Sequence, residues 1–237
     1  MYKLCVIFFG LLVISSCNTE ATKNINTVAI KYDTVVIGKQ TWLKENLNVS
    51  KFSNGDVISE AKTNDEWIKY WQIGEPAWCY YENKPENEKK YGKLYNRHAV
   101  DDKRRLAPEG YHIPTNAEWK VLIDYLGGAN VAGGKMKEVG IKHWVTEKVD
   151  STFTALPGGF RVENGEFYSV GYIGYWWTSE SSEEKQKWLA YYNRNYSGTG
   201  GFVPVAMNVV SLSDNDALSS KYFESGSGLS VRCLKNK

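Results

Sequence analysis

Cysteines are the residues of this chain with the clearest chemistry, and Cys17 is the most informative of them. Lys3 supplies a positive charge, and an apolar stretch broken by only one glycine follows over residues 4–14. A stretch of this length is typical of a signal peptide and is too short to span a bilayer as a helix. Two serines then lead to Cys17. We predict that residues 1–16 are removed and that Cys17 accepts a bacterial lipid anchor; an ordinary secretory signal with a chance cysteine is the alternative.

Removal of the signal and acylation of Cys17 leave Cys79 and Cys233 as the remaining thiols. Outside the cytoplasm two such thiols can form a disulfide, and two buried free cysteines are the alternative. Two cysteines alone cannot build a zinc site, and the sequence contains no Cys-X-X-Cys motif. The residues by themselves leave the choice between a disulfide and two free thiols open.

The histidines His98, His112 and His143 match no local metal-binding spacing, and the chain has no His-Glu-X-X-His motif. Nothing in the sequence supports a nucleophile of the serine or cysteine type with a histidine base. We therefore expect no catalytic residues, no bound metal and no cofactor. Residues 214–216 (Asp-Asn-Asp) group oxygen donors that suit calcium, although a solvated turn is the favoured interpretation.

An aromatic segment near the C-terminal end is the best candidate for ligand contact. Trp188, Tyr191 and Tyr192 can stack on sugar rings, and the adjacent Asn193 and Arg194 can donate hydrogen bonds. The competing interpretation is a half-buried strand followed by a polar turn. The sequence thus allows a carbohydrate-binding surface here but does not require one.

Composition places the chain among globular proteins and argues against nucleic acid as a partner. The formal net charge is +2, so no strongly basic face is expected. Residues 17–27 are polar and lack periodicity, which indicates a short tether. Residues 28–237 contain no internal repeat and no linker, so we predict one folded domain there.

Two segments carry helix-capping signals. Residues 63–66 (Thr-Asn-Asp-Glu) and 115–118 (Thr-Asn-Ala-Glu) both fit a capping box. The second is followed by apolar residues at helical spacing and then by a glycine pair that ends the helix. A further short helix is expected around residues 135–139. The apolar positions of the second helix are Trp119, Leu122, Ile123 and Leu126.

The rest of the chain has the pattern of short strands and turns. Asn164 and Gly165 mark a turn between two strand segments, and the adjacent Trp176 and Trp177 should face opposite sides of a strand. One of these tryptophans should be a core residue, with the other at the surface or under a loop. Helices and strands together predict a single α+β domain. The strands are expected at 28–37, 40–43, 160–162, 167–168, 175–179, 188–192, 203–210 and 229–234.

Seven segments follow one another over about residues 30–235. They are IGKQTWLKENLNV (37–49), YGKLYNRHAV (91–100), LAPEGYHIPTNAEWKVLIDYLGG (106–128), AGGKMKE (132–138), FTALPGGFR (153–161), YWWTSE (175–180) and SVRCL (230–234). In this order they resemble the Fibrobacter succinogenes major paralogous domain (FISUMP domain) of lipoproteins and secreted proteins in the Bacteroidetes–Fibrobacteres group. One departure is Arg97, where that family usually has an aromatic residue.

The segment HIPTNAEWKVL and the terminal SVRC are also similar to formylglycine-generating enzymes, which share a variant of the C-type lectin fold. This similarity implies a C-type-lectin-like domain with two main helices, twisted antiparallel strands and chain ends that lie close together. Those enzymes bind copper through a pair of active-site cysteines. Only Cys79 and Cys233 remain here, with Cys233 in the closing segment, so a structural disulfide is favoured over oxygenase chemistry.

We therefore expect a non-enzymatic, lipid-anchored protein of the cell envelope, at the outer membrane on its periplasmic or surface face. Its partners would be the membrane, through the N-terminal lipid, and a glycan or an envelope protein, through the lectin-like domain. A purely structural or assembly role without a small ligand is the second hypothesis. An enzyme of the formylglycine-generating type is the third, and the cysteine count disfavours it.

Overall fold

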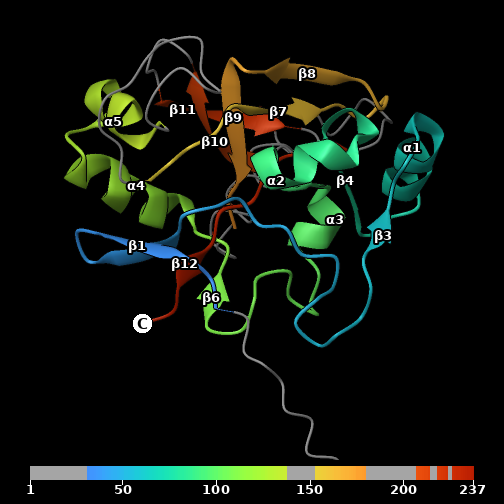
Figure 1. The fold of residues 1–237 in the computed structure, drawn as a ribbon, viewed down its shortest axis with the longest axis horizontal. Helices are drawn as coiled ribbons and strands as arrows, with labels where there is room; N and C mark the ends of the chain where they lie inside the picture. The colour runs from blue at the N-terminus through green and yellow to red at the C-terminus, as the bar shows by residue number, and fades with distance from the viewer. Residues whose placement is uncertain (1–30, 138–152, 180–206, 214–217, 224–225) are drawn as a thin grey trace, which may run out of the picture. The chain divides into compact units, whose positions relative to one another are not determined.

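The computed structural model describes residues 31–137, 153–179, 207–213, 218–223 and 226–237 (Figure 1). Residues Tyr32–Lys237 form one compact unit. It combines helices with mostly antiparallel sheets, so the predicted α+β class is confirmed. Among the described residues, no helix has both the length and the apolar character needed to cross a membrane.

The predicted helices both form where their capping residues stand. In α4 (Asn116–Tyr125) the Thr115 hydroxyl accepts from the Glu118 amide at 3.2 Å, and the Glu118 carboxylate accepts from the Thr115 amide at 2.9 Å. In α1 (Asn64–Gln72) the Thr63 hydroxyl likewise accepts from the Glu66 amide. The described helices also include α2 (Glu88–Tyr91), α3 (Arg97–Val100), α5 (Ala129–Met136) and the 3-10 turns η1 (Tyr81–Asn83) and η2 (Pro85–Asn87).

The short helix expected around residues 135–139 begins earlier than predicted. It is α5, which starts directly after Gly128, and Lys137 already has an extended backbone. Two glycines inside the segment lower its intrinsic helix propensity. Burial of Ala132, Gly133 and Met136 on one side of the helix outweighs that cost.

The described strands group into three sheets. The first has the order β1 (Thr34–Ile37), β2 (Gln40–Leu43), β12 (Leu234–Lys235), β6 (Tyr111–His112). The second has the order β11 (Leu218–Phe223), β10 (Met207–Ser213), β9 (Ile173–Trp177), β7 (Gly158–Arg161), β8 (Phe167–Val170). The third has the order β3 (Ser59–Glu60), β4 (Ala77–Cys79), β5 (Leu94–Tyr95), and its β3–β4 pair is parallel, as is β7–β9.

Strand β9 separates two parts of the hydrophobic core. Figure 1 shows α4 and α5 on one side of β9 and α1 on the other. Trp176 packs in the core cluster that contains Trp119 of α4, whereas Trp177 packs in the cluster that contains Tyr95. Both indoles are fully buried. The prediction that they face opposite sides is confirmed. Of the two alternatives for the second tryptophan, the surface position is wrong because both sides of β9 are covered.

The closing segment also differs from the alternating strand expected over residues 229–234. Residues 226–234 are all buried, and only Leu234 and Lys235 form a regular strand. Leu234 pairs with Trp42 of β2, while Leu229 and Ser230 make isolated bridges to Tyr95 and Trp176. Residues 226–234 thus run through the interior between the sheets, and this path buries Arg232.

Candidate functional site

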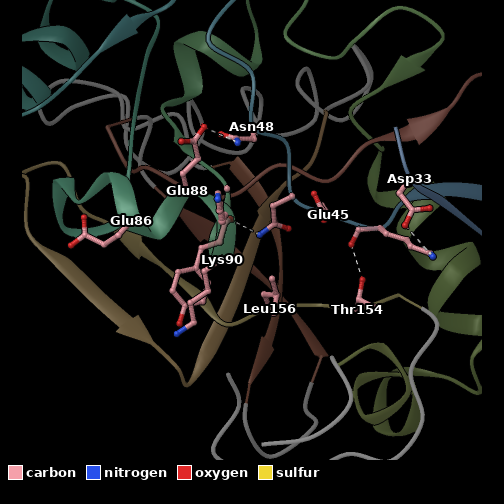
Figure 2. Close-up of a pocket in the computed structure, with 13 residues that line it drawn as sticks. Asp33, Glu45, Asn48, Glu86, Glu88, Lys90, Thr154 and Leu156 are labelled. Atoms are coloured by element: carbon pink, nitrogen blue, oxygen red, sulfur yellow. Dashed lines mark hydrogen bonds and ion pairs between the residues drawn. The ribbon is translucent and has the colours of Figure 1, made fainter. Parts of the chain in front are cut away.

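A groove of about 750 Å³ lies where four separate parts of the chain meet. Its lining comes from the start of β1, the segment after β2, the turn and helix around α2, and the segment before β7. Figure 2 shows these side chains around the opening. The lining residues are Asp33, Lys44, Glu45, Asn46, Asn48, Glu86, Glu88, Lys89, Lys90, Tyr91, Gly92, Thr154 and Leu156.

Asn46 forms the floor of the groove and ties it to the core. Its amide nitrogen donates to the Tyr91 carbonyl at 3.0 Å and to the Ser230 hydroxyl at 3.3 Å. Its side-chain oxygen accepts from Trp176 Nε1 at 2.8 Å and from Arg232 Nη2 at 3.0 Å. These bonds use both amide hydrogens and both lone pairs, so the side chain is fixed in one orientation. Asn46 therefore holds the floor in place and is not free to bind a ligand.

Arg232 lies directly beneath this floor. One guanidinium nitrogen, Nη1, donates to the carbonyls of Leu43, Lys44 and Phe153 at 3.1, 2.6 and 2.8 Å. The group also sits 4.5 Å from the centre of the Phe153 ring. Burial lowers the pKa of the guanidinium to about 9, so it keeps its proton at neutral pH. Within the described residues, no carboxylate forms an ion pair with it.

One end of the groove carries a carboxylate that is held by its neighbours. Glu88 Oε1 accepts from Asn48 Nδ2 at 3.0 Å (Figure 2). The same oxygen lies 3.9 Å from Lys93 Nζ. Lys93 is buried, with its ammonium 4.3 Å from the Trp78 ring centre and 5.6 Å from that of Tyr80. Burial lowers the pKa of Lys93, and the charge of Glu88 opposes that shift. The Lys93 position is thus fixed by two aromatic rings, and it orients Glu88.

The other end carries the ion pair between Lys44 Nζ and Asp33 Oδ2, which are 3.2 Å apart. Glu45 lies between the two ends in Figure 2. Thr154, on the opposite wall, donates its hydroxyl proton toward the Lys44 carbonyl at 2.7 Å. Charged groups with fixed amides and a hydroxyl therefore line the opening, and this set can donate and accept hydrogen bonds in several directions at once.

The lining is made of carboxylates, ammonium groups, side-chain amides and a hydroxyl. Among the described residues that line the groove there is no histidine, cysteine or serine. A Ser–His or Cys–His pair therefore does not face it. In the part of the chain that the structure describes, no group of three or more His, Cys, Asp and Glu side chains is placed to hold a metal ion.

The two cysteines do not form the favoured disulfide. Cys79 is a free thiol on β4 in the core cluster of Trp67 and Leu94, and Cys233 is a free thiol in the cluster of Tyr95. Burial raises the pKa of Cys79 to about 11 and that of Cys233 to about 12. The disulfide is thus corrected to two buried thiols, because Cys79 on β4 and Cys233 just before β12 belong to different core clusters.

The remaining candidates from sequence fall partly outside the described residues. Cys17, the tether, residues 214–216 and His143 lie outside them. So does the proposed ligand-contact segment with Trp188, Tyr191, Tyr192, Asn193 and Arg194. Of the other histidines, His98 Nε2 is 3.1 Å from the Trp71 carbonyl, and His112 Nε2 is 3.0 Å from Glu118 Oε1. Neither histidine lines the groove.

Comparison with protein families gives a match to the Fibrobacter succinogenes major domain over residues 35–235. The chain belongs to this family. Comparison with curated proteins and with solved structures gives no match. The family assignment predicted from the seven ordered segments is therefore confirmed.

In this Fibrobacter succinogenes major domain, three of the seven segments that carry the resemblance supply residues of the groove lining. Residues 37–49 supply four lining residues, residues 91–100 supply two, and residues 153–161 supply two more. The closing segment 230–234 places Arg232 below them. Sequence reasoning missed this site because it examined the segments one at a time. The available signal was Arg232, a charged residue inside an otherwise buried segment.

Proposed function

We propose that this chain is a lipid-anchored protein of the bacterial cell envelope, at the outer membrane, whose Fibrobacter succinogenes major domain binds glycan without catalysing a reaction. The lipid would be attached to Cys17, as the apolar stretch and small residues before it indicate. The C-type-lectin-like architecture inferred from sequence similarity is part of the same proposal. The groove would be the glycan-binding site.

The observation that carries the proposal is the polar lining of the groove. Sugar hydroxyls both donate and accept hydrogen bonds, and the lining offers carboxylates, ammonium groups, an amide and a hydroxyl from four chain segments. A volume of about 750 Å³ lies within the usual range for sites that hold a small ligand. The fixed pair of Asn48 and Glu88 would present an amide and a carboxylate to neighbouring hydroxyls.

The aromatic segment with Trp188, Tyr191 and Tyr192 is a second proposed contact region for the same ligand. The groove itself offers little ring surface, because Tyr91 is only 5% exposed. Stacking on a sugar ring would then depend on this segment, with hydrogen bonds supplied by the groove. The two contributions can be separated by substitution.

The test is a glycan array probed with the full chain, followed by titration of any glycan that binds. Changing Asn48 and Glu88 together to alanine should weaken binding about tenfold or more, since two oriented hydrogen-bonding groups are lost. Glu109→Ala is the control, because Glu109 is exposed and does not line the groove. Binding that the groove variant leaves unchanged, or no binding to any glycan, would overturn the proposal.

The anchor is tested separately by mass spectrometry of the mature N-terminus. We expect the chain to begin at Cys17 with the mass of attached acyl chains, and Cys17→Ser to remove both the acyl mass and the membrane association. An unmodified Cys17 in the mature protein would refute the anchored part of the proposal and leave the glycan-binding part standing.

A further inference from the structure

The groove has a positive charge built beneath its floor. Arg232 is fully buried, and backbone carbonyls with the Asn46 side chain satisfy its donors. These carbonyls are neutral dipoles, so the hydrogen bonds stabilise the guanidinium without cancelling its charge. The Lys44 carbonyl and the Asn46 side chain, which hold Arg232, belong to residues that line the groove. Only one layer of chain therefore separates the charge from the opening.

The charges around the opening do not neutralise Arg232. Asp33 is paired with Lys44, and Glu88 lies close to Lys93. That leaves two exposed carboxylates, Glu45 and Glu86, beside two lysines, Lys89 and Lys90. In the described part of the chain, neither of these carboxylates forms an ion pair. The positive charges of Lys89 and Lys90 balance the negative charges of these two carboxylates. The positive charge of Arg232 is therefore left as the net charge of the site.

We propose that the groove selects saccharides that carry an anionic group, a carboxylate or a sulfate, and holds that group over the floor formed by Asn46 above Arg232. This inference rests on the proposed glycan-binding function and names the chemical class of the ligand. A buried charge acts through a low-dielectric interior, so its field at the floor is stronger than that of an equally distant charge in water.

Glu45 has a particular part in this selection. It is an exposed carboxylate of the lining, and its charge also acts on Arg232 across the floor. The charge of Glu45 partly offsets the buried charge of Arg232. An anionic ligand would compete with that carboxylate for the same field. Removing the charge of Glu45 should therefore favour an anionic saccharide and leave a neutral one nearly unaffected.

The experiment compares three probes by calorimetric titration of the full chain at low salt. They are a galacturonic acid trisaccharide, a sulfated galactose trisaccharide and the neutral galactose trisaccharide. We expect at least one anionic probe to bind about tenfold more tightly than the neutral probe, with an affinity that falls as salt is added. The anionic probe that binds more tightly distinguishes carboxylate from sulfate.

Substitutions then show which charge causes the preference for the anionic probe. Glu45→Gln should tighten binding of the anionic probe about threefold to tenfold without a matching change for the neutral probe. Glu109→Gln, the same charge change on an exposed residue outside the groove, should change neither affinity. A chain with Lys44, Lys89 and Lys90 all changed to glutamine should bind more weakly but still prefer the anionic probe, because Arg232 remains.

The outcomes separate this inference from the proposed function. Equal binding of the neutral and anionic probes, or tighter binding of the neutral one, would overturn the inference and leave glycan binding intact. Loss of all preference in the triple lysine variant would overturn the part assigned to Arg232. Failure of every saccharide to bind would overturn the proposed function itself.

Discussion

Asn46→Ala should be among the most destabilising single substitutions at the groove, although it removes only one small polar side chain. Trp176 and Arg232 are fully buried, and both donate to the Asn46 side-chain oxygen. In the variant, Trp176 Nε1 loses its acceptor inside the core. A buried polar group left unpaired costs about 1–3 kcal/mol. One such group, with one weakened contact of the buried arginine, leads to an expected loss of about 2–4 kcal/mol in the free energy of unfolding.

Urea denaturation followed by far-ultraviolet circular dichroism measures this loss. The matched control is Asn48→Ala, because Asn48 is exposed and its side chain donates to Glu88 at the surface. That control should cost less than about 0.5 kcal/mol. If Asn46→Ala costs no more than Asn48→Ala, the assignment of Asn46 as the residue that fixes the floor is refuted.

A double-mutant cycle isolates the bond to the indole. Trp176→Phe removes the N–H donor while keeping an aromatic ring in the core. In that background Asn46→Ala leaves one fewer unpaired group, so its cost should fall by about 1–2 kcal/mol. An unchanged cost would mean that the 2.8 Å bond between Trp176 and Asn46 contributes nothing measurable.

Three further predictions concern the cap and the cysteines. Thr115→Ala removes the α4 cap and should cost about 1 kcal/mol in urea denaturation, whereas Lys120→Ala on the exposed face should cost little. The Glu118 carboxyl is partly desolvated, which raises its pKa, but bonds from Thr115 and His112 lower it below 4.5 overall. Its stabilising contribution is therefore present above that value and lost as pH falls through the lowered pKa, and Glu118→Gln should flatten this acid-side loss. Cys79 and Cys233 should resist a thiol reagent at pH 8 until urea unfolds the chain, as peptide mass spectrometry would show; a peptide pair linked by a disulfide would contradict the free thiols.

Local signals predicted local structure well. The capping residues Thr63 and Thr115 start α1 and α4, and Asn164 with Gly165 forms the turn between β7 and β8. These features depend on bonds between residues a few positions apart, which the sequence displays directly. The closing segment was predicted less well. An alternating pattern implies one buried and one exposed face, but both faces of residues 226–234 are covered by other parts of the chain.

The sequence by itself determined the family, the α+β class, the capped helices and the signal-like N-terminus that makes Cys17 the expected lipid site. Only the tertiary structure decided that Cys79 and Cys233 are separate buried thiols and that Asn46 and Arg232 meet under a groove. The physical reason is sequence separation. Asn46 and Arg232 are 186 positions apart, and a contact of that kind is fixed by how the sheets pack and not by any local pattern.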